Sequence, residues 1–150
     1  MAKLTYNVSG IMQEGTRTLF GGGSLSYAPD ELVKKILNRQ ADVVVRALEK
    51  SGHERLNVKG KSQHITEKSF KKKNIKRDAN GDRYKDVLPT GERPNGKNKT
   101  KRKAEVAFLN EYGVPSKRMV ARQFIAAAID EVEDELVKIA QEELEKYYDI

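Results

Sequence analysis

Two stretches of the chain carry apolar residues at helical spacing, and both predict long amphipathic helices. The first spans residues 29–52. It begins with Pro29, Asp30 and Glu31, because proline fits the first turn and carboxylates favour the positive end of the helix dipole. Gly52 is placed to end it. We expect its apolar stripe to face the core: Leu32, Val33, Ile36, Leu37, Val44, Ala47 and Leu48.

The second predicted helix runs from about Lys117 to Tyr147. At about 1.5 Å per residue it is roughly 45 Å long, so we expect its end to project from a small domain. Its apolar face consists of Ile125, Ile129, Val132, Leu136, Ile139, Ala140, Leu144 and Tyr147. Its opposite face is acidic, which favours solubility or partner contact: Asp130, Glu131, Glu133, Asp134, Glu142, Glu143 and Glu145.

Extended, basic segments flank the pair Asn80-Gly81. This pair strongly favours a hairpin turn, because both residues tolerate positive φ. We therefore expect a long basic β-hairpin. The residues that follow it, 89–103, are rich in proline, glycine and lysine and predict a mobile loop.

Together these patterns predict one α+β domain over residues 1–150, in which a small antiparallel sheet with a long basic hairpin packs against two long amphipathic helices, plus flexible loops. The expected segments are a strand with a flexible arm (1–28), the first helix (29–52), the basic hairpin and loop (62–103), and a short motif with the C-terminal helix (104–150).

A short motif precedes the last helix. Ala104, Ala107, Phe108 and Glu111 fall at i, i+3, i+4 and i+7, which predicts one face of a short helical stretch. Gly113 is placed to end that stretch in a left-handed conformation, and Pro115 prevents its continuation.

This order of residues resembles the signature of the head-tail joining, or tail-completion, proteins of long-tailed bacteriophages and prophages. That signature reads as an apolar run, Glu-(Phe/Tyr)-Gly, a polar loop, and then Ala-Arg-Pro-Phe at the start of the last helix. The chain departs from it at Gln123, where the family has proline, so we expect the helix to begin earlier, near Lys117. The matching positions are Ala107, Phe108, Asn110, Glu111, Tyr112, Gly113, Ala121, Arg122, Phe124 and Ile125.

The resemblance implies a virion structural protein of the neck or upper tail, assembled in the bacterial host cytoplasm as a homo-oligomeric ring, for which it suggests six copies. Its implied partners are the phage neck and tail-tube proteins. For Glu111 and Arg122, one interpretation is an ion pair within or between subunits, and the other is a contact that only stabilises the motif. The assembly residues carried over are Phe108, Glu111, Tyr112, Gly113, Arg122 and Phe124.

Charge is distributed unevenly along the chain, whose net charge is +7. Residues 68–103 hold 14 Lys or Arg and four Asp or Glu, whereas residues 130–150 hold two and nine, which gives segments of +10 and −7. Opposite charges on one subunit suit a head-to-tail interface between copies around a ring. The alternative is that both segments are solvated faces of a soluble protein.

A second functional class is a nucleic-acid-binding protein that uses residues 68–103, because many basic side chains there are available to contact phosphates. Phe70 and Tyr84 are the only aromatic residues in that window, which supplies a base-stacking platform poorly. The candidate contacts to a neighbouring subunit or to DNA are Lys71, Lys72, Lys73, Lys97, Lys99, Lys101, Arg102 and Lys103.

Enzyme chemistry finds little support in the sequence. There is no cysteine, and the two histidines, His53 and His64, are isolated in polar surroundings. The phosphate-loop pattern from Gly91 to Lys97 is followed by Asn98 in place of the Ser or Thr that holds magnesium. We expect no catalytic residue, no cofactor and no metal ligand. No apolar run approaches about 18 residues, so we expect no membrane span.

Overall fold

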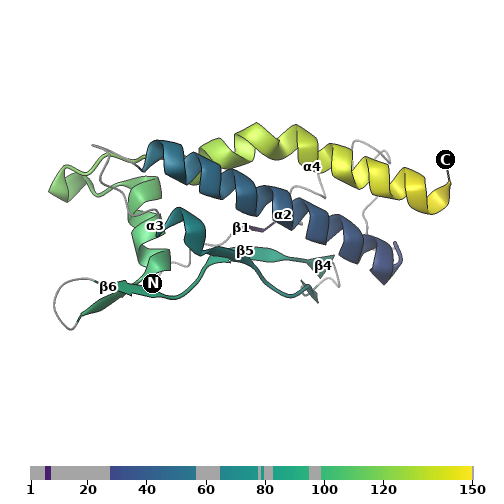
Figure 1. Ribbon diagram of the computed structural model, residues 1–150, viewed down its shortest axis with the longest axis horizontal. Coiled ribbons are helices and arrows are strands. Elements are labelled where there is room, and N and C mark those ends of the chain that lie inside the picture. Colours follow the sequence, from purple (N-terminus) through teal and green to yellow (C-terminus); the bar gives the residue numbers. More distant parts are fainter. Residues whose placement is uncertain are drawn as a thin grey trace.

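The computed structural model describes residues 6–7, 28–56, 65–77, 79, 83–94 and 99–149. Their elements lie in three layers (Figure 1). Helix α4 (Phe124–Tyr148) lies along helix α2 (Asp30–Arg55), and α2 covers one face of the antiparallel strands. The predicted α+β class is confirmed. Among the described residues, no helix combines the length and the apolar character that crossing a membrane requires.

Helix α2 buries the whole predicted stripe: Leu32, Val33, Ile36, Leu37, Val44, Ala47 and Leu48. The predicted end at Gly52 is wrong, because the helix continues to Arg55. Gly52 is buried against the 3₁₀ turn Glu67–Ser69, and a Cβ atom on it would lie 2.3 Å from the Cβ atom of Glu67. This glycine therefore permits a close approach between two elements.

Helix α4 begins at Phe124, so the expected start near Lys117 is wrong. Pro115–Lys117 is a separate 3₁₀ turn, and Arg118 after it has a left-handed φ of 54°. Gln123 has a φ of 46°, which a right-handed helix does not contain. Two left-handed residues thus separate the turn from the helix.

Helix α4 packs antiparallel to α2 along most of its length (Figure 1). Two polar side chains of α2 bind the backbone of α4. Ser51 Oγ donates to the Phe124 carbonyl at 2.6 Å, and Gln40 Nε2 donates to the Leu136 carbonyl at 2.8 Å. The predicted apolar positions buried in the shared core are Ile125, Val132, Leu136, Ile139, Ala140 and Leu144.

Two further predictions for α4 are wrong. Glu143, expected on the exposed face, is buried and pairs with Arg39 of α2 at 2.8 Å. Tyr147, expected on the apolar face, is 44% exposed. The last turn of α4 extends past the start of α2 (Figure 1), so α2 offers Tyr147 and Tyr148 no cover.

The central strands form the predicted basic hairpin. β2 (Phe70–Lys72) pairs antiparallel with β5 (Asp86–Pro89), and β1 (Tyr6–Asn7) pairs with the other edge of β5. The hairpin continues as β3 (Lys76–Arg77) paired with β4 (Arg83–Tyr84). Most of the predicted Asn80-Gly81 turn lies outside the described residues, as does the rest of the predicted N-terminal strand and arm.

The two halves of this hairpin differ in register. Lys72 lies opposite Val87 and Lys76 opposite Tyr84, so three residues on one strand face two on the other. One extra residue is a β-bulge, which bends the strand that carries it. The bulge brings Asn74 and Ile75 to a groove beside the first turns of α2.

The segment expected as a mobile loop contains a second hairpin, so that expectation is wrong for its described part. β6 (Glu92–Pro94) pairs antiparallel with β7 (Thr100–Arg102), and the Lys103 N–H donates to the Gly91 carbonyl at 3.0 Å. Proline is tolerated in such an edge strand, where its missing N–H breaks no ladder on the outer side.

Candidate functional site

The motif that precedes the last helix folds as a helix and a sharp turn. Helix α3 (Lys103–Tyr112) buries Ala107 completely and ends at Gly113, as predicted. Gly113 has φ 73° and ψ 177°, a combination that is almost restricted to glycine. A Cβ atom there would lie 2.6 Å from both the Ala121 nitrogen and the Met119 oxygen. Both conformation and space therefore require glycine.

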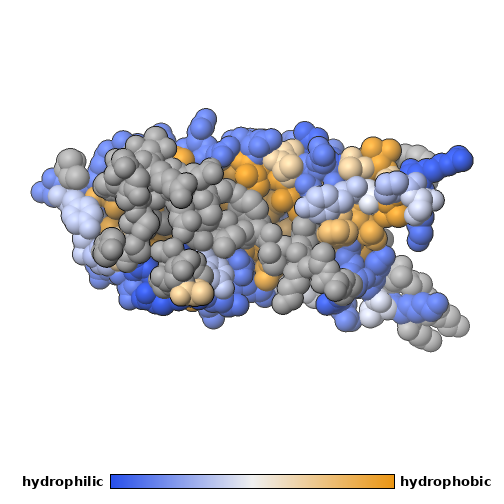
Figure 2. All heavy atoms as spheres, turned by 180° about the vertical axis from the view of Figure 1, so that it is seen from behind, coloured by the Kyte–Doolittle hydropathy of each residue, from blue (hydrophilic) through white to orange (hydrophobic). Residues whose placement is uncertain are grey.

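The turn after Gly113 closes on itself. Val114 N–H donates to the Met119 carbonyl at 2.9 Å, and Met119 N–H donates back to the Val114 carbonyl at 3.0 Å. The turn occupies one end of the molecule, where Tyr112 is 60% exposed and Val120 is 78% exposed (Figure 1). From behind, Figure 2 shows apolar surface at the same end among charged residues. A well-defined turn thus displays large apolar side chains.

Glu111 connects the end of α3 to the start of α4. Its side chain is buried, and its Oε2 and Oε1 atoms accept hydrogen bonds from the N–H groups of Ile125 (2.7 Å) and Ala126 (3.1 Å). The Gln123 side chain, at the N-cap position, forms no capping hydrogen bond. A carboxylate from another helix therefore satisfies the free N–H groups of α4 and favours its positive dipole end.

The expected ion pair between Glu111 and Arg122 is not formed within the described chain, because the Glu111 carboxylate is engaged by backbone amides. Arg122 contributes its backbone instead, donating its N–H to the Asn110 carbonyl at 2.8 Å. Within the described chain Glu111 thus makes a contact that stabilises the motif, and its partners, the amides of α4, were not evident from the sequence.

The aromatic motif residues separate into a core position and a surface pair. Phe124 is fully buried, and its ring meets that of Phe70 edge-on at a centroid distance of 6.0 Å. Phe108 is half-buried and its ring lies 4.9 Å from that of Tyr112. Phe124 therefore anchors the motif to the core, whereas Phe108 supports the exposed Tyr112.

The predicted basic contacts lie on two separate hairpins. Lys71 and Lys72 are exposed on β2 and Lys73 follows it, half-buried. Around β7, Lys99 and Arg102 are exposed, and Lys101 and Lys103 are half-buried. Two of these side chains are already paired: Lys72 with Asp42 at 2.8 Å and Arg102 with Glu105 at 3.3 Å. Lys97 lies outside the described residues.

Within the described ranges, no three His, Cys, Asp or Glu side chains gather as metal ligands would. Comparisons of the chain with protein-family models, curated proteins and solved structures give no match.

Proposed function

We propose that the protein is a virion structural subunit at the head-tail junction, or at the top of the tail, of a tailed bacteriophage. Copies of it assemble as a ring that joins the neck to the tail tube. The proposed functional class comes from the resemblance of the motif around Glu111, Gly113 and Phe124 to that of tail-completion proteins. The geometry supports the proposal because these residues shape the connection between α3 and α4.

The observation that carries the proposal is the ordered turn that follows α3. Gly113 fixes its entry, and Glu111 binds the start of the helix that leaves it. Tyr112, the last residue of α3, and Val120, after the turn, are both exposed to solvent. A preformed surface loses little conformational entropy when it docks, and exposed apolar side chains supply the area that a protein interface buries. The turn therefore suits contact with a neighbouring protein.

In the direct test, phage heads and tails prepared without this chain are mixed with the purified protein, and joined particles are counted by electron microscopy. We expect the wild-type protein to restore joining. The double variant Tyr112→Ser, Val120→Ser should fold normally by circular dichroism yet fail to join particles. Tyr148→Ser, which changes an exposed aromatic residue at the opposite end, is the control. Equal joining with and without the wild-type protein would refute the proposal.

A further inference from the structure

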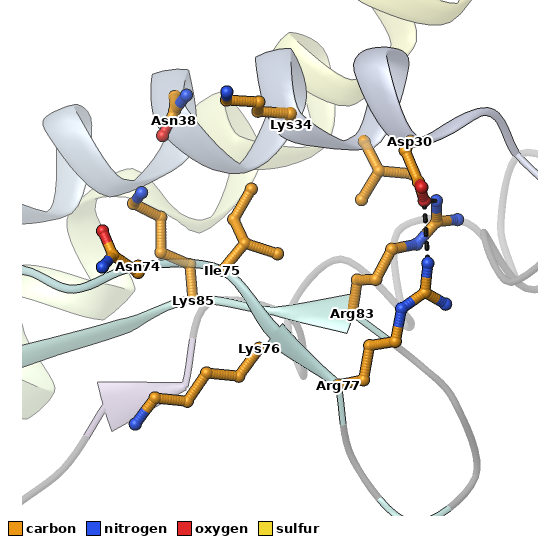
Figure 3. Close-up of a pocket in the computed structure, with 10 residues that line it drawn as sticks. Asp30, Lys34, Asn38, Asn74, Ile75, Lys76, Arg77, Arg83 and Lys85 are labelled. Atoms are coloured by element: carbon orange, nitrogen blue, oxygen red, sulfur yellow. Dashed lines mark hydrogen bonds and ion pairs between the residues drawn. The ribbon is translucent and has the colours of Figure 1, made fainter.

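A groove of about 410 Å³ lies between the first turns of α2 and the bulged part of the basic hairpin (Figure 3). Helix α2 contributes Asp30, Lys34 and Asn38 from one side, and the hairpin contributes the other wall. The cationic side chains of that second wall are Lys76, Arg77, Arg83 and Lys85. Five of the lining residues are cationic and one is anionic, so the groove suits an anionic group.

The one carboxylate of the groove is already engaged. Asp30 pairs with Arg77 at 3.0 Å and also with the buried Arg83, whose other nitrogen donates to the Ala28 carbonyl at 2.7 Å (Figure 3). In the part of the chain that the structure describes, no carboxylate forms an ion pair with Lys34, Lys76 or Lys85. Three lysines that form no ion pair therefore line the groove, although the Lys76 side chain extends away from α2 at the outer side of the hairpin (Figure 3).

Lys85 is the deepest of these cations, with only 7% of its surface exposed. Burial lowers its pKa, and the charges of Lys72 and Lys34 lower it further, while Asp42 opposes them. No carboxylate of the described chain forms an ion pair with this largely buried lysine, and a carboxylate brought by a partner would stabilise its charged form. Its largely buried position distinguishes the groove from a scatter of surface lysines.

A complementary anionic surface lies on α4. Asp130, Glu133 and Asp134 occur at i, i+3 and i+4, so they share one helix face, and all three are exposed. Within the described chain they form no ion pair, whereas Glu131 pairs with Lys50 and Glu142 pairs with Arg39. We name these three residues the acidic face.

The groove and the acidic face lie in different layers of the molecule. The groove is between α2 and the hairpin, whereas the acidic face is on α4, which packs on another side of α2 (Figure 1). They do not meet within one subunit, yet they suit each other in charge. A contact between two different patches of identical subunits is heterologous, and such contacts generate rings when the rotation closes.

We propose that the groove receives the acidic face of α4 from a second copy of this chain, in a head-to-tail contact. This inference rests on the proposed ring-forming function and names the surfaces that meet. Nucleic acid is the competing occupant, because phosphates are also anions. The exposed carboxylates of the same chain favour a protein contact, because every subunit then brings one acidic face for each groove.

Charge reversal tests the contact on the full-length chain. One variant carries Lys34→Glu and Lys76→Glu, at two exposed positions of the groove. A second carries Asp130→Lys and Asp134→Lys, and a third combines all four changes. The control variant, Lys68→Glu with Arg46→Glu, makes the same charge change at exposed residues outside the groove. Thermal unfolding confirms that each variant folds.

Sedimentation velocity at low ionic strength then measures self-association. We expect the wild type and the control to form oligomers that dissociate as salt is added. Each single-face variant should associate about tenfold or more weakly, and the combined variant should regain association because both charges are reversed together.

Four results would overturn the inference. If the groove variant forms the same oligomers as the wild type, the inference fails while the proposed ring stands; if the wild type itself stays monomeric, both fail. If the combined variant does not regain association, the two surfaces do not pair. A loss of low-salt DNA binding in the groove variant, with oligomers unchanged, would assign the groove to nucleic acid and refute the protein contact.

Discussion

The α2–α4 pair and the region made by the hairpins, α3 and the following turn are held together by different contacts. The two long helices share an apolar core, with α2 alone burying seven residues of one predicted stripe. The second region contributes few residues to that core, chiefly Phe70, Val87 and Ala107. Its geometry depends instead on backbone conformation at Gly113, the amides bound by Glu111 and the pairing of Arg83 with Asp30.

This difference has a functional meaning. Apolar burial is non-directional, so a core of this kind tolerates many apolar sequences. A network of hydrogen bonds and ion pairs instead holds its residues in one specific geometry. The helix pair therefore provides most of the stability, and the second region fixes the shape of the turn and of the hairpin wall of the groove that we propose for assembly. Substitutions in the two regions should separate these roles.

The largest effect is expected in the shared core. Phe124→Ala removes a fully buried ring that meets Phe70, and it should lower the free energy of unfolding by about 3–5 kcal/mol. The half-buried Phe108, changed to alanine, should cost less than about 2 kcal/mol. Urea denaturation of both variants measures the difference. Equal losses would mean that the motif does not divide into a core anchor and a surface pair.

The next effect concerns the entry to the turn. Gly113→Ala meets both a left-handed φ and contacts of 2.6 Å, so we expect a loss of about 2–4 kcal/mol. Gly91→Ala is the matched control, because Gly91 also has positive φ but its nearest neighbour atom would be 3.7 Å away. It should cost about 1 kcal/mol. A similar loss at both sites would show that the close approach at Gly113 is unimportant.

A smaller effect is expected where the hairpin meets α2. Arg83→Met keeps an unbranched apolar stem but removes the guanidinium group, so Asp30 and the Ala28 carbonyl lose their buried donor, which should cost about 1–3 kcal/mol. Arg77→Met removes an exposed partner of the same carboxylate and should cost less than about 1 kcal/mol. The free energies of unfolding at low and high salt distinguish the two, since the exposed pair is the more strongly screened. A larger loss at Arg77 would contradict the arrangement in Figure 3.

The smallest of these effects is the cap on α4. Glu111→Ala leaves the Ile125 and Ala126 amides without their acceptor and should cost about 1–2 kcal/mol. Glu105→Ala, on the same helix, loses only its ion pair with Arg102 and should cost less than about 0.5 kcal/mol. Amide hydrogen exchange at Ile125 and Ala126 provides a local measurement. Unchanged protection in Glu111→Ala would refute the capping role.

The sequence predicted features that local pattern alone determines. Apolar periodicity predicted both long helices, because a helix that buries one face needs apolar residues at helical spacing, as α2 and α4 have. The Asn80-Gly81 pair gave the hairpin, and Gly113 gave the end of α3. In each case the residues that determine the structure are close neighbours along the chain.

The missed features depend on residues that are distant in sequence. The role of Gly52 follows from Glu67 packing on it, and the start of α4 is fixed by left-handed backbone at Gln123 together with the Glu111 carboxylate. The groove has one local signal in the sequence, the alternation of basic residues along the second strand of the hairpin. Arg83 and Lys85 alternate with half-buried residues and take inward positions, where a charge calls for a partner.

The most direct test of the central claim is native mass spectrometry of the purified full-length chain, first at low and then at increasing ionic strength. The account predicts one closed oligomer with a defined number of copies at low ionic strength, which dissociates to monomers as salt screens the contact between groove and acidic face. Monomers alone at every concentration and ionic strength, including after addition of the neck and tail-tube proteins, would contradict it.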